Sequence, residues 1–261
     1  MRLGFSAVTA GLVDPREAFA LAAELGLDLE LSSDLQEIFP ELPGARELRE
    51  MGRAAGVGFT IHLPFVDLNL ASVVEPAWAT GLERMQRALE FAEAVEAQVG
   101  VLHTGRIPLR HPVLIEAAKE RLAQALERLG PPPVPVAVEN LALDRRDLLE
   151  EPAELVRLVE DAGEGFGYTL DLPHAYVQGG EAQIHAYLEA MRASRAPLLH
   201  LHLHDNRGDR DDHLPVGAGS LPYPVFKEAL RGFAGTAALE VIGGAEGVKN
   251  SLRALRRAWD I

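Results

Sequence analysis

The sequence predicts a closed barrel of eight parallel β-strands, each followed by an α-helix, that is, a single (β/α)8 TIM-barrel domain over residues 1–261. Short apolar runs typical of buried strands alternate eight times with longer amphipathic runs typical of helices. Eight such units in 261 residues have the count and the length of a TIM barrel. An open, doubly wound sheet is the alternative, but it usually has fewer units and a glycine-rich first turn, which Gly4 and Gly11 do not supply.

The predicted elements follow one another without a linker or a low-complexity segment. The expected strands cover residues 3–8, 28–32, 58–63, 99–103, 134–139, 166–171, 198–204 and 237–241. The expected helices cover residues 15–25, 45–55, 76–97, 112–129, 151–162, 181–194, 223–232 and 247–258. Asp14 before Pro15 predicts a helix start, and Gly26 and Gly56 are placed to end helices.

Residues 198–220 form the most informative stretch of the chain. They begin with LLHLHLH, and this period-two alternation predicts a strand with leucines on one face and imidazoles on the other. A polar loop with Asp211, Asp212 and His213 follows, and the spacing to His213 favours Asp211 over Asp212 as a ligand. Imidazole and carboxylate groups crowded at the end of one strand suggest a metal site.

Other predicted strands also end on potential metal ligands. All strands of a TIM barrel end at one mouth, where the chemistry collects. The candidate metal ligands are His62, His103, Glu139, Asp171, His174, His202, Asp211, His213 and Glu240. One such residue alone is often a hydrogen-bonded core histidine or a helix N-cap. So many charges in one concave space are costly unless cations neutralise them, so we expect one to three divalent ions, Zn²⁺ or Mn²⁺ first, with Fe²⁺ and Mg²⁺ also suited to these ligands.

Composition narrows the function classes. The formal net charge is -14, which disfavours non-specific binding to nucleic acid. The absence of cysteine excludes disulfides, thiolate catalysis and Cys-ligated zinc, and it fits a reducing compartment. No signal peptide and no apolar run of ~18 residues are visible, so we expect a soluble cytoplasmic protein without a membrane span. The lysines, Lys119, Lys227 and Lys249, fall in predicted helices or their first turns, which argues against a Schiff-base aldolase.

The segments HLPFVDLNLAS, LHTG, VEN, DLPHA, HLHDN, DDHLPVGAG and LEV together resemble the xylose isomerase-like TIM-barrel superfamily over essentially the whole chain. This superfamily includes sugar and sugar-phosphate isomerases and epimerases, and also endonuclease IV, which acts at apurinic/apyrimidinic sites. In epimerase-type members one metal is held by four residues, which match Glu139, Asp171, His202 and Glu240. In endonuclease IV the same four belong to a three-zinc cluster, and its other ligands match His62, His103, His174, Asp211 and His213.

The resemblance implies two candidate functions. We expect a metal-dependent isomerase or epimerase of a sugar, polyol or sugar phosphate, with Glu139 and Glu240 as the catalytic acid and base. Endonuclease IV-type phosphodiester hydrolysis is the alternative, and a non-catalytic binding barrel also stays open. Against the nuclease, the loop LSSDLQEIFPELPGAR is acidic until Arg46, where endonuclease IV has aromatic and basic residues that contact DNA.

Arginines on the mouth side indicate how a substrate is held. They are Arg106, Arg110, Arg145, Arg146, Arg207 and Arg210, and they form either a solvated rim or a clamp for phosphate or carboxylate. As substrate-binding residues we expect Arg106, Arg207, Arg210 and Phe65, with a small anionic or polyhydroxylated substrate. The oligomeric state stays open, a homo-oligomer included.

The remaining histidines receive secondary roles. We expect His200 either in the core or next to a metal ligand without binding the ion itself, and His204 with Asp205 beside His202 as groups that orient its ring. His111 and His185 fall on or near predicted helices and are expected at the surface.

Overall fold

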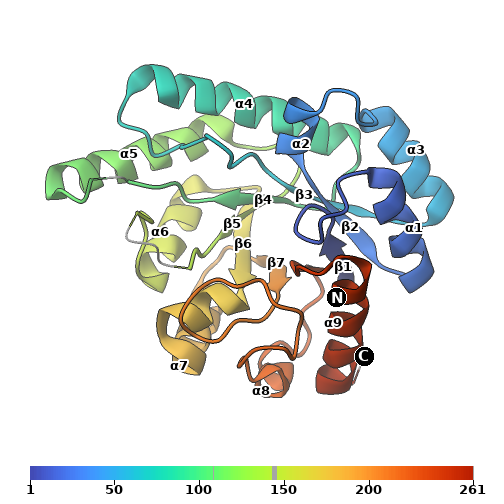
Figure 1. Ribbon diagram of the computed structural model, residues 1–261. Helices are drawn as coiled ribbons and strands as arrows, with labels where there is room; N and C mark the ends of the chain where they lie inside the picture. The colour runs from blue at the N-terminus through green and yellow to red at the C-terminus, as the bar shows by residue number, and fades with distance from the viewer. Residues whose placement is uncertain (108, 143–145, 261) are drawn as a thin grey trace.

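The strands form a closed parallel barrel with the helices outside it, as the sequence predicts (Figure 1). This computed structural model describes residues 1–107, 109–142 and 146–260. Each strand pairs in parallel with the next one along the chain, and β8 closes the ring by pairing with β1. The strands are β1 (Arg2–Ser6), β2 (Asp28–Ser32), β3 (Phe59–His62), β4 (Gly100–His103), β5 (Val136–Glu139), β6 (Phe166–Asp171), β7 (Leu198–Leu203) and β8 (Thr236–Leu239).

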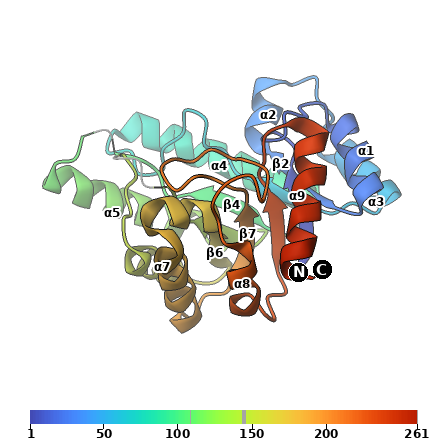
Figure 2. The same ribbon diagram turned by 60° about the horizontal axis from the view of Figure 1, so that its bottom comes forward.

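The helices cover the outside of the barrel, and α8 packs beside α9 near the two chain termini (Figure 2). They are α1 (Pro15–Leu25), α2 (Ser33–Ile38), α3 (Ala45–Ala55), α4 (Glu75–Ala94), α5 (Pro112–Leu129), α6 (Pro152–Ala162), α7 (Leu172–Ala193), α8 (Tyr223–Ala229) and α9 (Gly244–Trp259). In the described part of the chain, none is long and apolar enough to cross a membrane.

Local sequence signals set several helix ends where they were expected. Asp14 caps α1 by accepting a hydrogen bond from the Arg16 N–H at 2.9 Å. Gly26 ends the same helix with φ 67°, a left-handed conformation that glycine adopts without steric cost. The predicted end of α8 was less accurate, because this helix stops at Ala229 rather than at residue 232.

Two helical segments were not predicted. The short helix α2 follows β2 directly, where the sequence suggests only a loop. Helix α7 begins at Leu172 rather than at residue 181, because the Asp171 side chain accepts the His174 N–H at 2.5 Å and caps the helix. The chain then breaks at Gly179 and Gly180, and the expected helix continues beyond that break. The additional first turns place His174 at the barrel mouth.

Side chains along β7 alternate between two environments, the hydrophobic core and the inside of the barrel. Leu201 and Leu203 are fully buried and belong to the hydrophobic core. His200 and His202 are also fully buried, and they contact Glu30 of β2 at 3.2 and 3.4 Å. Because β2 and β7 are not neighbours in the ring, these side chains must meet inside the barrel.

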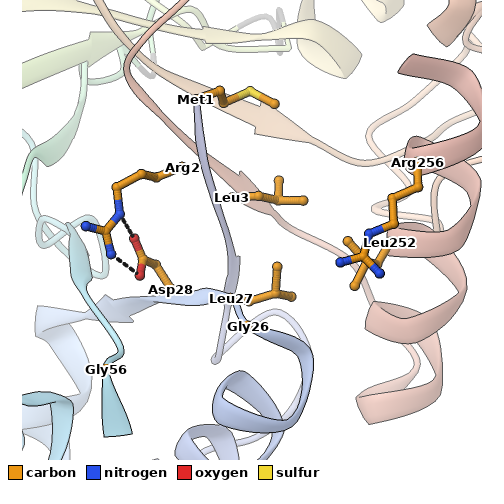
Figure 3. Close-up of a pocket in the computed structure, with 9 residues that line it drawn as sticks. All are labelled: Met1, Arg2, Leu3, Gly26, Leu27, Asp28, Gly56, Leu252 and Arg256. Atoms are coloured by element: carbon orange, nitrogen blue, oxygen red, sulfur yellow. Dashed lines mark hydrogen bonds and ion pairs between the residues drawn. The ribbon is translucent and has the colours of Figure 1, made fainter. Parts of the chain in front are cut away.

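At the opposite, N-terminal end of the barrel, an ion pair joins β1 to β2 beside a pocket of about 360 Å³ (Figure 3). The Arg2 guanidinium donates two hydrogen bonds of 2.7 Å to the Asp28 carboxylate. The Gly58 N–H and the Gln98 side chain donate to the same carboxylate at 2.8 and 3.1 Å. The donors lie at or just before the starts of β1, β3 and β4, and the acceptor lies at the start of β2, so this group serves stability.

This arrangement predicts how acid affects stability. Burial alone would raise the pKa of Asp28, but the hydrogen bonds from Arg2, Gln98 and Gly58 outweigh it and hold the pKa below its ordinary value. A carboxyl whose pKa is lower in the folded state adds stability above the unfolded pKa of ~3.9, and that stability is lost as the pH falls through the folded pKa. We expect Asp28→Asn to lower the free energy of unfolding by about 1–2 kcal/mol at pH 7.

Urea unfolding of wild type and Asp28→Asn at pH 7 and pH 3 measures this effect. The difference between the two proteins should shrink at pH 3. An equal difference at both pH values would contradict the role given to the ionised carboxylate.

Candidate metal centre

The residues expected as metal ligands come together at the mouth of the barrel. They surround a pocket of about 440 Å³, which seven of the nine line directly: His62, His103, Glu139, His174, Asp211, His213 and Glu240. The other two, Asp171 and His202, are fully buried. His202 Nδ1 lies 3.2 Å from Glu139, 3.3 Å from Glu240 and 3.7 Å from Asp171. The strand ends, the first turn of α7 and the loop after β7 therefore bring all nine side chains together at the mouth.

Two further groups lie on either side of this central one. At one side His103 Nε2 is 3.2 Å and His62 Nε2 is 4.0 Å from the same oxygen of Glu139. At the other side Asp211 Oδ2 is 3.2 Å from His174 Nε2 and 3.0 Å from His213 Nε2. The ligand atoms within each side group lie within 4.8 Å of one another, which suits one ion in each.

Backbone carbonyls orient three of the histidines by hydrogen bonding to one ring nitrogen, Nδ1. The Nδ1 atoms of His62, His174 and His213 bond to the carbonyl oxygens of Leu63, Asn140 and Glu240 at 3.0, 2.9 and 2.8 Å. A carbonyl can only accept, so in the neutral ring Nδ1 carries the hydrogen and Nε2 keeps its lone pair. In all three rings Nε2 points at a carboxylate. Metal-binding histidines are typically held in this way.

Burial and charge act in opposite directions on the acidic groups. Burial raises the pKa of Glu139, but His202 and His103 lower it more, and the net pKa lies well below the ordinary value. Burial raises the pKa of Glu240, and the neighbouring Glu30 and Glu139 raise it further, so its net pKa lies above the ordinary value. Two carboxyl groups beside one imidazole thus differ in how strongly they hold a proton, a pattern typical of acid–base pairs.

The histidines also differ among themselves. Burial lowers the pKa of His62 to about 4, so this ring is neutral at pH 7 and its Nε2 lone pair is available. Burial would lower the pKa of His213 as well, but Asp211 and Glu240 raise it to about 9. In the absence of an ion, a proton on His213 offsets the charge of Asp211; a bound cation would take over that task.

The loop after β7 carries Asp211 and His213, and Asp205 organises it. The Asp205 carboxylate accepts the backbone N–H groups of Asn206, Gly217 and Leu221 at 2.9, 2.9 and 3.0 Å. Gly219 must be glycine, because a Cβ there would lie 2.4 Å from the Asp205 carboxylate. Asp205 therefore shapes the loop, and the expectation that it orients His202 is wrong.

His204 also contacts other groups than His202. Its Nε2 lies 3.3 Å from Asp171, and its ring stacks on His213 with 4.0 Å between centroids. His213 itself has φ 49°, a conformation that residues other than glycine seldom adopt and that often occurs at functional sites. His204 thus belongs to the Asp211 side of the mouth.

Phe65 and Arg106, two of the expected substrate-binding residues, line the mouth pocket. The Phe65 ring lies edge-on to His62 with 4.8 Å between centroids. The buried Asp34 of α2 accepts the Phe65 N–H at 3.0 Å and fixes this loop. Arg106 pairs with Asp147 at 3.2 Å. The helix that the sequence did not predict thus helps to build the pocket wall.

The other arginines are placed differently. Arg207 and Arg210 pair with Asp212 at 3.4 and 2.6 Å, and neither is among the described residues that line the pocket. Arg110 pairs with Glu150. Arg145 lies outside the described residues. Two of the expected substrate-binding residues, Arg207 and Arg210, are therefore at the rim rather than in the pocket wall.

Glu30 is the functional candidate that the sequence analysis did not assign. It is 1% exposed, and its Oε2 lies 3.2 Å from His200 Nε2 and 3.4 Å from His202 Nε2. A glutamate inside the buried strand sequence DLELS was the available signal, because an unpaired charge is rarely tolerated there. His200 is buried as expected, and both His111 and His185 are exposed.

Comparison with known proteins agrees with the fold. The model of the xylose isomerase-like TIM barrel family matches residues 19–258. The chain belongs to the xylose isomerase-like TIM-barrel family. Two uncharacterized members from Methanocaldococcus jannaschii are each 28% identical to it, over 200 and 189 residues. These matches cover 74% and 70% of this chain and 67% and 69% of the relatives.

Solved structures of this barrel family superpose over nearly the whole chain. A D-tagatose 3-epimerase-like protein superposes with a TM-score of 0.86 at 24% identity. The match covers 100% of this chain and 97% of the epimerase-like protein. A D-psicose 3-epimerase with D-tagatose from Clostridium cellulolyticum H10 has a TM-score of 0.77 at 17% identity, with coverage of 100% and 97%. A Thermus thermophilus protein, TTHB071, soaked with ZnCl2, has a TM-score of 0.71 at 26% identity, with coverage of 98% and 96%.

The ligand geometry predicts that metal removal destabilises the protein. When the free cation concentration is about 100 times the dissociation constant, binding stabilises the folded state by about 2.7 kcal/mol. Removal of the cation should therefore lower the Tm by roughly 5–10 °C. Differential scanning calorimetry before and after chelation, and after return of Zn²⁺ or Mn²⁺, measures this shift.

Two variants control this measurement. His202→Ala, which removes a central ligand, should shrink the metal-dependent shift, and His185→Ala, at an exposed position, should leave it intact. Equal Tm values for the stripped and reloaded wild type would contradict the metal centre.

Proposed function

We propose that the protein is a divalent-metal-dependent isomerase or epimerase of a sugar. The observation that carries this proposal is the pair of buried glutamates, Glu139 and Glu240, that approach the same His202 nitrogen at 3.2 and 3.3 Å beneath an open pocket. Two carboxyl groups on either side of a reacting carbon are what proton removal and return require. The sugar epimerases among the similar structures support this choice.

The donor set fits a divalent cation. It consists of imidazole nitrogens and carboxylate oxygens, which suit Zn²⁺ or Mn²⁺. The Glu139 Oε2 atom is buried and has no hydrogen-bond partner among the described residues, a costly state that a cation would relieve. Glu139, Asp171, His202 and Glu240 would hold the central ion. Bound there, the ion would polarise a substrate carbonyl and make the adjacent C–H more acidic.

The protein's own groups divide the proton transfer between them. Glu139 and Glu240 are the groups suited to take the substrate proton and to return one, because both are buried carboxyl groups beside His202. Phe65 and the apolar side chains Leu68 and Leu141 line the pocket above them and give it an apolar wall.

The charge pattern of the mouth favours an uncharged sugar over a sugar phosphate. Arg106 pairs with Asp147, and Arg207 and Arg210 both pair with Asp212. A phosphate would have to compete with these carboxylates and would face the carboxylates of the pocket itself. The pocket volume of about 440 Å³ lies in the lower part of the range of ~300–1,000 Å³ for small-molecule sites. A monosaccharide suits that size.

The first functional prediction concerns proton exchange. The metal-loaded protein should exchange a carbon-bound hydrogen of at least one ketose with D₂O, which NMR detects. Glu139→Gln and Glu240→Gln should each lower the exchange rate by about 10²–10⁴-fold, because each removes one proton-transfer group. Glu189→Gln, at an exposed position on α7, should exchange at the wild-type rate.

A negative result across a broad panel of ketoses would argue against this function. The same preparations then test the alternative, endonuclease IV-type hydrolysis. The observation that favours this alternative is that all nine residues that match the zinc ligands of endonuclease IV lie together at the mouth. Cleavage of a duplex with a single abasic site, with three metal ions per chain and no ketose exchange, would favour the nuclease.

The second functional prediction concerns substrate charge. For a ketose that is turned over, kcat/KM should exceed that of its terminal phosphate ester by at least about 10-fold, since like charges facing each other cost several kcal/mol. Steady-state kinetics on the two substrates measure this ratio. A preference for the phosphate ester would contradict the placement of Arg207 and Arg210 at the rim and the pairing of Arg106 with Asp147.

A further inference from the structure

We propose that Glu30 positions His202 for metal binding: it accepts the Nε2 hydrogen from behind the ring and so directs the Nδ1 lone pair at the central ion. This inference rests on the proposed metal centre and concerns a residue outside its ligand set. It assigns a function to a buried carboxylate that the proton-transfer chemistry does not use.

The placement of the two residues carries the first step. Glu30 lies on β2 and His202 on β7, which are not hydrogen-bonded neighbours in the barrel. Their side chains, 1% and 0% exposed, meet inside it with 3.4 Å between Oε2 and Nε2. Both side chains are buried, so bulk solvent screens the interaction between the carboxylate and the ring less than it would at the surface.

The two nitrogen atoms of the His202 ring have different neighbours. Glu139, Glu240 and Asp171 all approach Nδ1, at 3.2, 3.3 and 3.7 Å. Glu30 approaches Nε2. A ligand imidazole must be neutral and must keep its lone pair on the nitrogen that faces the ion, so its hydrogen must sit on Nε2.

Without Glu30, the opposite tautomer would be favoured. The carboxylates at Nδ1 would accept a hydrogen there, whereas Nε2 would have no hydrogen-bond acceptor among the described residues. That tautomer presents an N–H instead of a lone pair to the ion. Glu30 therefore performs for His202 the task that backbone carbonyls perform for His62, His174 and His213.

Further contacts fix the Glu30 carboxylate in place. Thr60 of β3 donates its hydroxyl to Oε2 at 3.2 Å, and His200 Nε2 lies 3.2 Å from the same oxygen. His200 is itself fixed by Thr236 of β8, with 2.6 Å between Nδ1 and Oγ1. The carboxylate is thus held from several strands at once and cannot turn away from His202.

Glu30, His200 and His202 could also be read as a metal site of their own. Two facts favour the positioning role. Thr60 and His202 make hydrogen bonds of 3.2 and 3.4 Å to Oε2, so these contacts converge on one oxygen rather than on a space between ligand atoms. In addition, a second ion here would require His202 to bind metals through both ring nitrogens, which leaves no N–H on the ring.

The other Glu30 oxygen indicates why the residue is present. Oε1 is buried without a hydrogen-bond partner among the described residues. Such an atom costs stability. A residue kept for folding alone would be replaced by an apolar one at little loss, so the carboxylate serves the neighbouring site.

The experiment compares metal affinity with folding stability. Dissociation constants for Mn²⁺ are measured by EPR of the unbound ion in wild type, Glu30→Leu, Glu30→Gln and Asp28→Asn. Glu30→Leu removes the acceptor and should weaken the central site by 10–100-fold. Glu30→Gln keeps a carbonyl acceptor and should weaken it less. Asp28→Asn, two residues away on the same strand, should bind Mn²⁺ as wild type does.

The outcomes separate this inference from the metal centre. If wild type binds no Mn²⁺ and no Zn²⁺, both are wrong. If wild type binds and Glu30→Leu binds within twofold of it, only the positioning role is wrong. The Tm of the metal-stripped Glu30→Leu protein should be unchanged or higher, and a lower Tm together with unchanged metal affinity would mark Glu30 as a purely structural residue.

A measurement on the wild type covers the case in which Glu30→Leu does not fold. Long-range ¹H–¹⁵N NMR of the Zn²⁺-loaded protein, with labelled histidine, reports the tautomer of each ring. The His202 signal, identified by its loss in His202→Gln, should show hydrogen on Nε2 and metal on Nδ1. Metal on Nε2 would overturn the proposal.

Discussion

The burial of several carboxylates around one imidazole is the constraint on which the rest of this barrel mouth depends. Glu30, Glu139, Asp171 and Glu240 are all buried, and His202 lies among them. Ionised carboxylates in such a space repel one another and cannot remain there without compensation. Protonated histidines, backbone N–H groups and cations are the compensations that this geometry permits. The orientation of His62, His174 and His213 favours cations, because a backbone carbonyl accepts the Nδ1 hydrogen of each ring and, in the neutral ring, leaves the Nε2 lone pair on the side of the acids.

The barrel was predictable because its signals are local and repeated. Each strand is a short apolar run, and the alternation in LLHLHLH fixes which face of β7 enters the barrel. Helix α2 escaped prediction because its six residues are too few to establish a helical period. The early start of α7 escaped because the cap, Asp171, is also a strand end and a candidate ligand, and the glycines behind it suggest a turn.

The metal centre was predictable only as a set of residues. Parallel strands end at one mouth, so a list of strand ends is also a list of neighbours. Sequence could not assign Glu30, because its contact with His202 joins strands that are far apart in the ring. Nor could it separate Arg106, which lines the pocket, from Arg207 and Arg210, since ion pairs within loops depend on backbone geometry.

Two carboxylates on the same strand, β2, have different roles, one in stability and the other at the candidate site. Asp28 and Glu30 are two residues apart, so they project from the same face of the strand. Asp28 receives hydrogen bonds from Arg2, Gly58 and Gln98 on both oxygens. Glu30 directs one oxygen at His202 and leaves the other without a donor among the described residues. Asp28 is fully hydrogen-bonded, whereas Glu30 stays partly unpaired inside the barrel and contacts a candidate ligand; this difference supports a role for Glu30 at the neighbouring site.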